Sequence, residues 1–180
     1  MESNDLTDPN NFPIILYADG ACRNNGSKNA TGGWAYILLW DSMKKEFRHS
    51  GFEQSTTNNR MEIKSILFGL QDIQSRWSNP YPQIAVISDS KYCINGASTW
   101  MYSWERRGWK KGKKIESKSP LLNVDLWKDM FEVCTTLNPS FFWVKGHNGN
   151  KYNELCDSLA FTSIRSRQEY SKSIRNSILD

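Results

Sequence analysis

The chain has 180 residues, a length that suits one domain of ordinary size with a hydrophobic core of its own. No apolar run approaches the roughly 18 residues of a membrane span, and the amino-terminal segment lacks the basic and then apolar pattern of a secretion signal, so we expect a soluble protein with no membrane partner. The net charge is +4, yet seven basic and two acidic residues lie between Glu105 and Lys118, which makes this segment a focused basic patch that can attract a polyanion.

The first predicted element is a buried strand that ends in an acid. Residues 14–17 read Ile-Ile-Leu-Tyr, which is typical of a central strand buried on both faces. Asp19 follows at its end, and Gly20 permits a close turn there. An acid at this place loses solvation unless it meets cations or faces a cleft; an ordinary strand-terminating turn is the alternative. Residues 1–13, acidic and rich in Asn, are expected to form a disordered tail.

Two further strands are predicted after a polar loop. Residues 22–33 are rich in turn formers, and residues 34–40 and 46–52 have the composition of strands joined by a short polar turn. Because a turn this short joins neighbouring antiparallel strands, we expect a hairpin. Together with the first strand it forms an antiparallel meander.

The polar run 54–62 leads into a predicted helix that ends near residue 77, before Asn79-Pro80. Glu62 stands at the edge of its apolar stripe, one turn from the helix start, so it can face a cleft at the end of the sheet. An acid that satisfies the helix dipole is the alternative. The apolar face consists of Ile63, Ile66, Leu67, Leu70, Ile73 and Trp77.

Residues 84–89 repeat the design of the first strand, an apolar run that ends in Asp89. A helical crossover leads into this run, so we expect it to pair parallel to the first strand. Parallel alignment places Asp19 and Asp89 at neighbouring carboxyl ends. The gap between them is the topological switch point where open α/β sheets bind ligands.

The remaining pattern predicts three helices and one more strand. Helices are expected over residues 91–104, from about residue 126 to near Asn138-Pro139, and from Asn153 to about residue 164, and the last strand over residues 141–145. The fold class is therefore α/β, with a five-stranded mixed sheet in which strands 4 and 5 lie parallel to strand 1 and helices cover both faces.

Two candidate site residues lie near the end of this pattern. His147 stands in a glycine-flanked polar loop, and Asp157 stands in the first turns of the closing helix, beside its apolar stripe. We expect one domain over residues 14–164. Residues 165–180, polar and rich in serine, are expected to form a fraying tail.

The cysteines give no sign of a disulfide framework or a zinc site. Their spacing shows no close pairs, and the two histidines complete no recognisable zinc pattern. Reduced thiols in a cytosol-like compartment are the simpler interpretation, so we expect a cytoplasmic protein. The cysteines are Cys22, Cys93, Cys134 and Cys156.

Asp19, Glu62 and Asp89, with Asp157 as a fourth, are expected to meet in one crevice. Like charges at one site repel, so such a cluster calls for cations. Mg²⁺ or Mn²⁺ prefers carboxylate oxygen, and two such ions about 4 Å apart can activate a water and stabilise the leaving oxygen of a phosphodiester. His147 can shuttle a proton; an ordinary surface histidine is the alternative.

Six motifs in order carry a resemblance to a known family. Over residues 14–163 the chain resembles type 1 ribonuclease H. The motifs are Tyr-Ala-Asp-Gly-Ala-Cys at 17–22, Thr-Thr-Asn-Asn-Arg-Met-Glu at 56–62, Ser-Asp-Ser at 88–90, Trp-Glu-Arg-Arg-Gly-Trp-Lys at 104–110, Asn-Val-Asp-Leu-Trp at 123–127, and Trp-Val-Lys-Gly-His at 143–147 with Asn-Glu-Leu-Cys-Asp at 153–157.

The resemblance implies a ribonuclease H-like fold and cleavage of the RNA strand of an RNA–DNA hybrid, which leaves 5′-phosphate and 3′-hydroxyl ends. It implies two Mg²⁺ ions, with Mn²⁺ as a substitute, and a monomer that needs no protein partner. The family's four metal-binding acids fall on Asp19, Glu62, Asp89 and Asp157, and its loop histidine falls on His147.

The resemblance also implies two sets of substrate-binding residues. Amide side chains can exchange hydrogen bonds with the 2′-hydroxyl that separates RNA from DNA, and aromatic faces with cations suit a nucleic-acid groove. The RNA-strand contacts fall on Asn25, Asn58 and Asn59, the DNA-strand phosphate pocket on Thr57 and Asn123, and the aromatic and basic protrusion on Tyr92, Trp100, Trp104, Arg106, Arg107 and Lys110.

Some positions depart from the family pattern or stay open. Lys91 stands where many relatives have a neutral residue beside the acids, and Ser55 where some place a phosphate-binding arginine. The tryptophans of the protrusion could instead belong to the core, and Trp109 fits either place. A DNA-directed nuclease or recombinase with the same fold, and a non-catalytic nucleic-acid-binding module, are the alternative functions.

Overall fold

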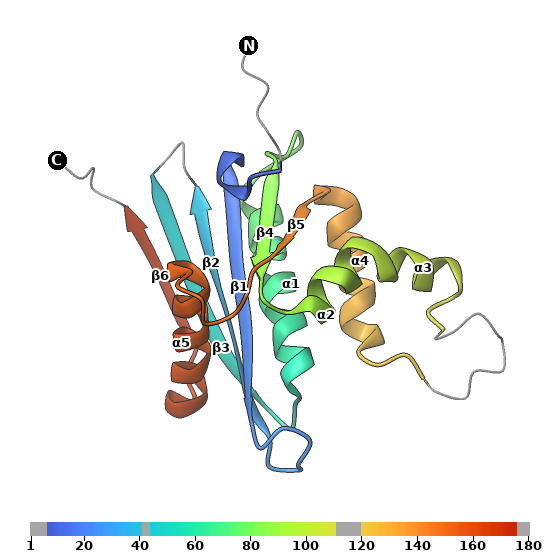
Figure 1. Ribbon diagram of the computed structural model, residues 1–180, viewed down its shortest axis with the longest axis vertical. Coiled ribbons are helices and arrows are strands. Elements are labelled where there is room, and N and C mark those ends of the chain that lie inside the picture. The colour runs from blue at the N-terminus through green and yellow to red at the C-terminus, as the bar shows by residue number, and fades with distance from the viewer. Residues whose placement is uncertain (1–6, 41–43, 111–119, 176–180) are drawn as a thin grey trace.

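The computed structural model describes residues 7–40, 44–110 and 120–175. Within them the chain forms a mixed sheet of the strand order β5-β4-β1-β2-β3-β6 (Figure 1). Strands β1, β2, β3 and β6 pair antiparallel, whereas β4 and β5 run parallel to β1, which confirms the predicted meander and the two parallel strands. The strands are β1 Ile14–Arg23, β2 Thr31–Trp40, β3 Lys45–Gln54, β4 Ile84–Ser88, β5 Ser140–Trp143 and β6 Tyr170–Arg175.

Helices cover both faces of the sheet, as predicted. Helix α1 packs across one face together with α2, α3 and α4, and α5 packs alone on the other (Figure 1). Among the described residues no helix is both long and apolar enough to cross a membrane. The helices are α1 Asn58–Arg76, α2 Lys91–Asn95, α3 Met101–Arg106, α4 Val124–Leu137 and α5 Lys151–Ser166.

Strand β1 lies at the centre of the core because both of its faces are apolar. Ile14 and Leu16 belong to the cluster beneath α1 and α4, while Ile15 and Tyr17 belong to the cluster beneath α5. Side chains alternate between the two faces of a strand. A continuous apolar run therefore fills both layers, as the sequence indicates.

The helix expected over residues 91–104 is not one regular α-helix. A five-residue π segment, Gly96–Trp100, separates α2 from α3, and helical structure continues to Arg106. A Cβ at Gly96 would lie 2.2 Å from the ring of Trp127, so the helix approaches α4 too closely for any side chain there. A single π turn within a helix, as at Gly96–Trp100, is a π-bulge.

A sixth strand is the main difference from the predicted five-stranded sheet. Arg167 adopts a left-handed φ of 52° after α5, and β6 then returns to pair with β3, with Tyr170 opposite Ser50. This structure lies within residues 165–180, for which a fraying tail was expected. A strand at a sheet edge has one open side and can be polar, so its sequence carries no apolar run to reveal it.

The amino-terminal segment also carries structure. Asp8 caps a short 3₁₀ helix, η1 Pro9–Asn11, by accepting a hydrogen bond from the backbone of Asn10. Phe12, which is 3% exposed, packs edge-on against Phe142 with ring centroids 5.5 Å apart. The end of the segment expected as a disordered tail, residues 1–13, is therefore anchored beside β5.

Candidate active site

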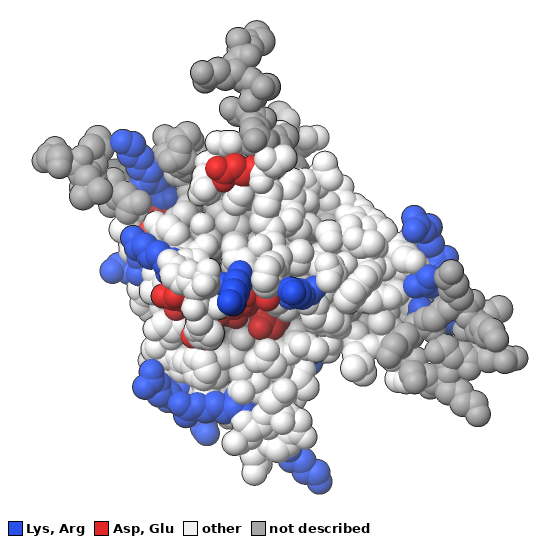
Figure 2. All heavy atoms as spheres, in the orientation of Figure 1, with Lys and Arg blue, Asp and Glu red and all other residues white. Residues whose placement is uncertain are grey.

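Three acidic side chains meet beside the middle of β1 and the carboxyl end of β4. Asp19 lies in β1, Glu62 in the second turn of α1, and Asp89 directly after β4. One carboxylate oxygen from each lies within 4.8 Å of the others. The parallel pairing of Tyr17 with Ile87 explains why Asp19 and Asp89, each two residues further along, lie close together. The prediction that the first strand ends at Asp19 with a turn at Gly20 was wrong, because β1 continues to Arg23 through its pairing with β2. In the space-filling view, acidic side chains gather near the middle of one face, with Lys and Arg side chains beside them (Figure 2).

Gly20 brings α1 against β1 at this point. A Cβ there would lie 2.3 Å from the backbone nitrogen of Glu62 and 2.4 Å from the carbonyl carbon of Met61. No side chain fits that distance, so glycine allows the helix to cross directly over the strand. The same residue donates its N–H to Asp19 Oδ1 at 2.7 Å, which fixes one oxygen of that carboxylate.

Glu62 and Asp19 are buried acids, and neither forms an ion pair with a described lysine or arginine. Burial, followed by the charge of Asp89, raises the pKa of Asp19 to about 8. Burial, followed by the charges of Asp19 and Asp89, also raises the pKa of Glu62. Glu62 Oε1 accepts a hydrogen bond from Asn58 Nδ2 at 3.3 Å, but its buried Oε2 has no partner among the described residues. This donor set of hard oxygens fits a divalent cation.

Asp89 is held by two hydrogen bonds. Asn153 Nδ2 donates to Asp89 Oδ2 at 3.2 Å, and Trp143 Nε1 donates to the Asp89 carbonyl at 2.9 Å. Gly146 leaves room for the carboxylate, because a Cβ there would lie 2.4 Å from Oδ2. Asn153 is 2% exposed and was not among the predicted site residues. The signal that could have revealed it is its place in the Asn-Glu-Leu-Cys-Asp motif.

Asp157 lies beside this cluster and not within it. It belongs to α5 and is absent from the group of oxygens within 4.8 Å. Its charge nevertheless helps to raise the pKa of Asp19. Burial raises the pKa of Asp157 itself; the charge of His147 opposes this shift, and that of Asp89 adds to it. His147 is exposed on its loop and adopts a left-handed φ of 49°.

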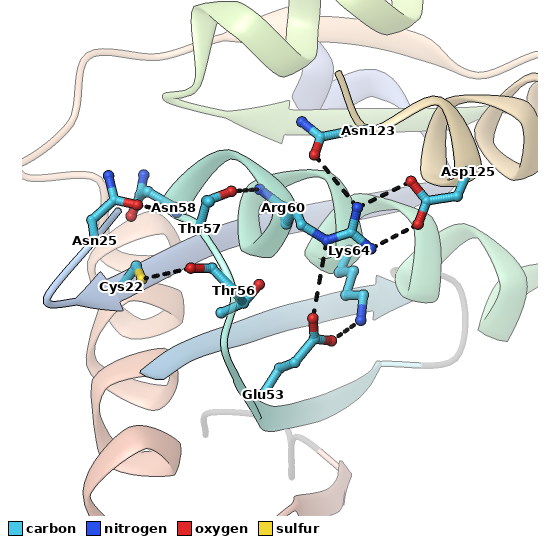
Figure 3. A network of polar contacts seen from close by, with 10 residues as sticks. All are labelled: Cys22, Asn25, Glu53, Thr56, Thr57, Asn58, Arg60, Lys64, Asn123 and Asp125. Carbon is cyan, nitrogen blue, oxygen red and sulfur yellow. Dashed lines mark hydrogen bonds and ion pairs between the residues drawn. The ribbon is translucent and has the colours of Figure 1, made fainter. Parts of the chain in front are cut away.

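The predicted RNA-strand residues gather at the start of α1 (Figure 3). The loop after β1 is tied to the helix because Asn25 Oδ1 accepts the backbone N–H of Asn58 at 3.1 Å. Asn59 is exposed on the first turn. Thr57 caps the helix and is exposed, and Asn123 precedes α4 with its Nδ2 3.5 Å from the hydroxyl of Tyr92. Both predicted phosphate-pocket residues therefore lie at helix starts.

The aromatic residues of the protrusion belong partly to the core and partly to the surface. Tyr92 accepts a hydrogen bond from Nε1 of the buried Trp127 at 3.1 Å, and Trp104 packs edge-on against the same ring at 5.5 Å. Trp100 is 39% exposed. Trp109 is half-buried against Phe131, with ring centroids 5.9 Å apart. It therefore packs against the edge of the core and is neither fully buried nor fully exposed.

The basic residues of the protrusion are described only in part. Arg106 and Lys110 are exposed and Arg107 is half-buried. Lys111, Lys113, Lys114 and Lys118 lie outside the described residues. The ammonium of Lys91 lies 4.4 Å from the ring centroid of Trp143, so this departure from the family pattern is held by a cation–π contact.

Comparisons with known proteins agree on one family. The family model described as RNase H matches residues 11–165. Ribonuclease H of Treponema denticola is 39% identical over 157 residues, which cover 82% of this chain and 94% of that protein. Ribonuclease H of Francisella philomiragia is 40% identical over 151 residues, which cover 84% and 90%.

Solved structures share the fold. The crystal structure of LC9-RNase H1, a type 1 RNase H with the type 2 active-site motif, superposes with a TM-score of 0.77 at 24% identity, covering 91% of this chain and 77% of that one. LC11-RNase H1 in complex with an RNA/DNA hybrid superposes with a TM-score of 0.60 at 18% identity, covering 85% and 97%. At these identities the likeness concerns the fold.

Proposed function

The chain belongs to the RNase H family, and on this premise we propose that it is an endonuclease that hydrolyses the RNA strand of RNA–DNA hybrids and leaves 5′-phosphate and 3′-hydroxyl ends. The observation that carries the proposal is the convergence of Asp19, Glu62 and Asp89 within 4.8 Å. Three carboxylates this close repel one another, so the site is built for cations. A nuclease that uses divalent metal ions requires such a cluster of carboxylates to bind them.

In this proposal the metal ligands are Asp19, Glu62, Asp89 and Asp157. The unpartnered oxygen of Glu62 and the raised pKa values of Asp19 and Glu62 support it, because both features indicate acids that lack counter-charge. Two Mg²⁺ ions, or Mn²⁺ as a substitute, would activate a water and stabilise the leaving oxygen of the phosphodiester.

The chain's own residues orient the cluster and handle a proton. The Gly20 N–H holds one oxygen of Asp19, and Asn153 holds one oxygen of Asp89, so both carboxylates keep a fixed direction. His147 stands on an exposed loop, and its charge acts on Asp157. An imidazole there can deliver a proton to the leaving 3′-oxygen, because histidine is a common general acid and base in enzymes.

The substrate-binding proposal assigns the two strands to different residues. Asn25, Asn58 and Asn59 meet the 2′-hydroxyls of the RNA strand, and Thr57 and Asn123 hold a phosphate of the DNA strand. The protrusion follows the DNA strand with aromatic faces and cations. Its residues are Tyr92, Trp100, Trp104, Arg106, Arg107 and Lys110. We also propose that the protein acts as a cytoplasmic monomer without an obligatory protein partner.

One assay tests the proposal against its alternatives. Labelled RNA–DNA hybrid, double-stranded RNA and double-stranded DNA are incubated with Mg²⁺ or Mn²⁺, and we expect cleavage of the RNA strand of the hybrid alone. Asp19→Asn should abolish cleavage while hybrid binding persists, because the substitution removes a proposed metal ligand and leaves the substrate contacts in place. Preferred cleavage of duplex DNA would favour the DNA-directed alternative. Turnover unchanged in Asp19→Asn would refute the metal assignment.

A further inference from the structure

One residue contacts both members of the proposed DNA-strand pocket (Figure 3). The backbone N–H of Arg60 donates to Thr57 Oγ1 at 3.4 Å, and its guanidinium Nη1 donates to Asn123 Oδ1 at 3.5 Å. Thr57 caps α1, whereas Asn123 precedes α4, so no local sequence feature fixes their separation. Arg60 is the direct link between them.

The guanidinium of Arg60 is itself tightly held. Asp125, in the first turn of α4, accepts two hydrogen bonds from it, at 3.0 Å from Nη1 and 2.7 Å from Nη2. This pairing raises the pKa of Arg60 and lowers that of Asp125. A bidentate pair fixes both the position and the plane of the guanidinium. On a further side, Glu53 Oε1 lies 4.0 Å from Nε, and Lys64 also pairs with Glu53.

These contacts fix the direction of the hydrogen-bond donors of Asn123 and Thr57, the two side chains of the pocket. Arginine has only donors, so it must meet the oxygen of the Asn123 amide. The Nδ2 group therefore lies on the side away from Arg60, where the hydroxyl of Tyr92 is 3.5 Å away. Likewise Thr57 Oγ1 accepts from the Arg60 backbone, which leaves its O–H free to donate. Asn123 makes no side-chain cap to α4, although it occupies the cap position.

We propose that Arg60 is a positioning residue whose guanidinium holds the Asn123 amide beside the Thr57 hydroxyl, which its backbone N–H orients, so that both donate to one phosphate of the DNA strand. Asp125 balances its charge, so Arg60 acts through its neighbours and is not itself the phosphate ligand. This inference rests on the proposed function, because it assumes that Thr57 and Asn123 bind the DNA strand of a hybrid.

Steady-state kinetics on the hybrid test the role of Arg60. Because the pocket holds a strand that is not cut, we expect Arg60→Met to raise KM about tenfold and to change kcat less than about twofold. Arg60→Lys should rescue little of this loss, since one ammonium cannot face Asp125 in a bidentate way and also reach Asn123. Asp125→Asn alters an exposed side chain that leaves the core intact, and it should raise KM about threefold.

A double-mutant cycle separates positioning from direct binding. If Arg60 acts through Asn123, then Arg60→Met combined with Asn123→Ala raises KM no further than Asn123→Ala alone. Additive effects would mean that Arg60 binds the phosphate itself and would overturn the proposal. An unchanged KM in both Arg60→Met and Asp125→Asn would overturn it as well.

Arg76 supplies the matched control. It stands near the other end of α1 and pairs with Asp72 at 2.9 Å, so Arg76→Met removes an equivalent ion pair far from the pocket. The KM of Arg76→Met should equal that of the wild type. A rise in KM as large as that of Arg60→Met would mean that the Arg60 effect comes from general destabilisation of the helix. Wild-type protein that fails to cleave hybrids would refute the proposed function. Active wild type with unaffected Arg60 and Asp125 variants would refute only this inference.

Discussion

At the scale of single residues, the direction of each carboxylate depends on a neighbour that has no acidic character. Asp89 owes one of its oxygen contacts to Asn153, whose amide is buried and donates at 3.2 Å. The opposite oxygen of that amide, Oδ1, has no partner among the described residues. The side-chain amide of Asn153 therefore hydrogen-bonds Asp89 and no other described residue.

Asn153→Ala should lower kcat about tenfold and leave KM for the hybrid nearly unchanged, because a misdirected carboxylate impairs the reaction and not the remote substrate contacts. Single-turnover cleavage at saturating hybrid measures the effect. Thermal unfolding run in parallel establishes that the variant is folded. A folded variant that keeps its full single-turnover rate would show that Asp89 needs no help from Asn153.

The sequence predicts the acids far better than their neighbours. Asp19 and Asp89 end apolar runs, and Glu62 lies one turn into a helix, so periodicity and chain order bring all three to one crevice. Asn153 and Arg60 act through contacts between elements distant in the chain, and no local pattern announces such contacts. Their roles become visible only when α5 and α4 are placed against the sheet.

At the scale of elements, strand β6 closes the sheet edge that β3 would otherwise expose. It lies beyond residues 11–165, which match the family model. Its pairing with β3 runs from Lys45 to Ser50, and Ser171 also contacts the ring of His49 at 3.1 Å. The element was missed because an edge strand needs no apolar face, whereas the runs that built β1 and β4 were evident from composition.

Removal of residues 168–180 should lower the free energy of unfolding by about 2 kcal/mol, because several backbone hydrogen bonds of the β3 edge are lost. Cleavage of the hybrid should persist, since β6 and the acids lie toward opposite edges of the sheet. Urea unfolding measures the first effect, and size-exclusion chromatography reports any pairing of the exposed edges. Unchanged stability together with an unchanged elution volume would mean that β6 protects nothing.

At the scale of the whole molecule, the topology concentrates negative charge at one end of the sheet. The order β4-β1 with parallel strands, followed by the β1-β2 hairpin on the other side, creates the switch point, and α1 delivers Glu62 to it. This much follows from the sequence, because it needs only apolar runs, a crossover helix and a short turn. The short distances among the three acids do not follow from the sequence, because they depend on the close approach of α1 to β1 at Gly20, where no side chain fits.

Such a charge cluster should make the fold itself sensitive to divalent ions. Without them, repulsion and burial of Asp19, Glu62 and Asp89 oppose folding, so Asp19→Asn should raise the midpoint of thermal unfolding in EDTA. The expected rise is about 3 °C, which corresponds to roughly 1 kcal/mol for a domain of this size. Because a ligand that binds only the folded state stabilises it, Mg²⁺ should raise the unfolding midpoint of the wild type. The difference in midpoint between the wild type and Asp19→Asn should therefore become smaller.

Differential scanning calorimetry in EDTA and in Mg²⁺ measures both effects without any assay of cleavage. Asp129→Asn, which removes an exposed acid from α4 outside the cluster, is the matched control and should respond to Mg²⁺ as the wild type does. Equal shifts in the wild type and in Asp19→Asn would place ion binding elsewhere. A lower midpoint of Asp19→Asn in EDTA would show that the Gly20 hydrogen bond to its carboxylate outweighs the repulsion, and the cluster would then need no cation to be stable.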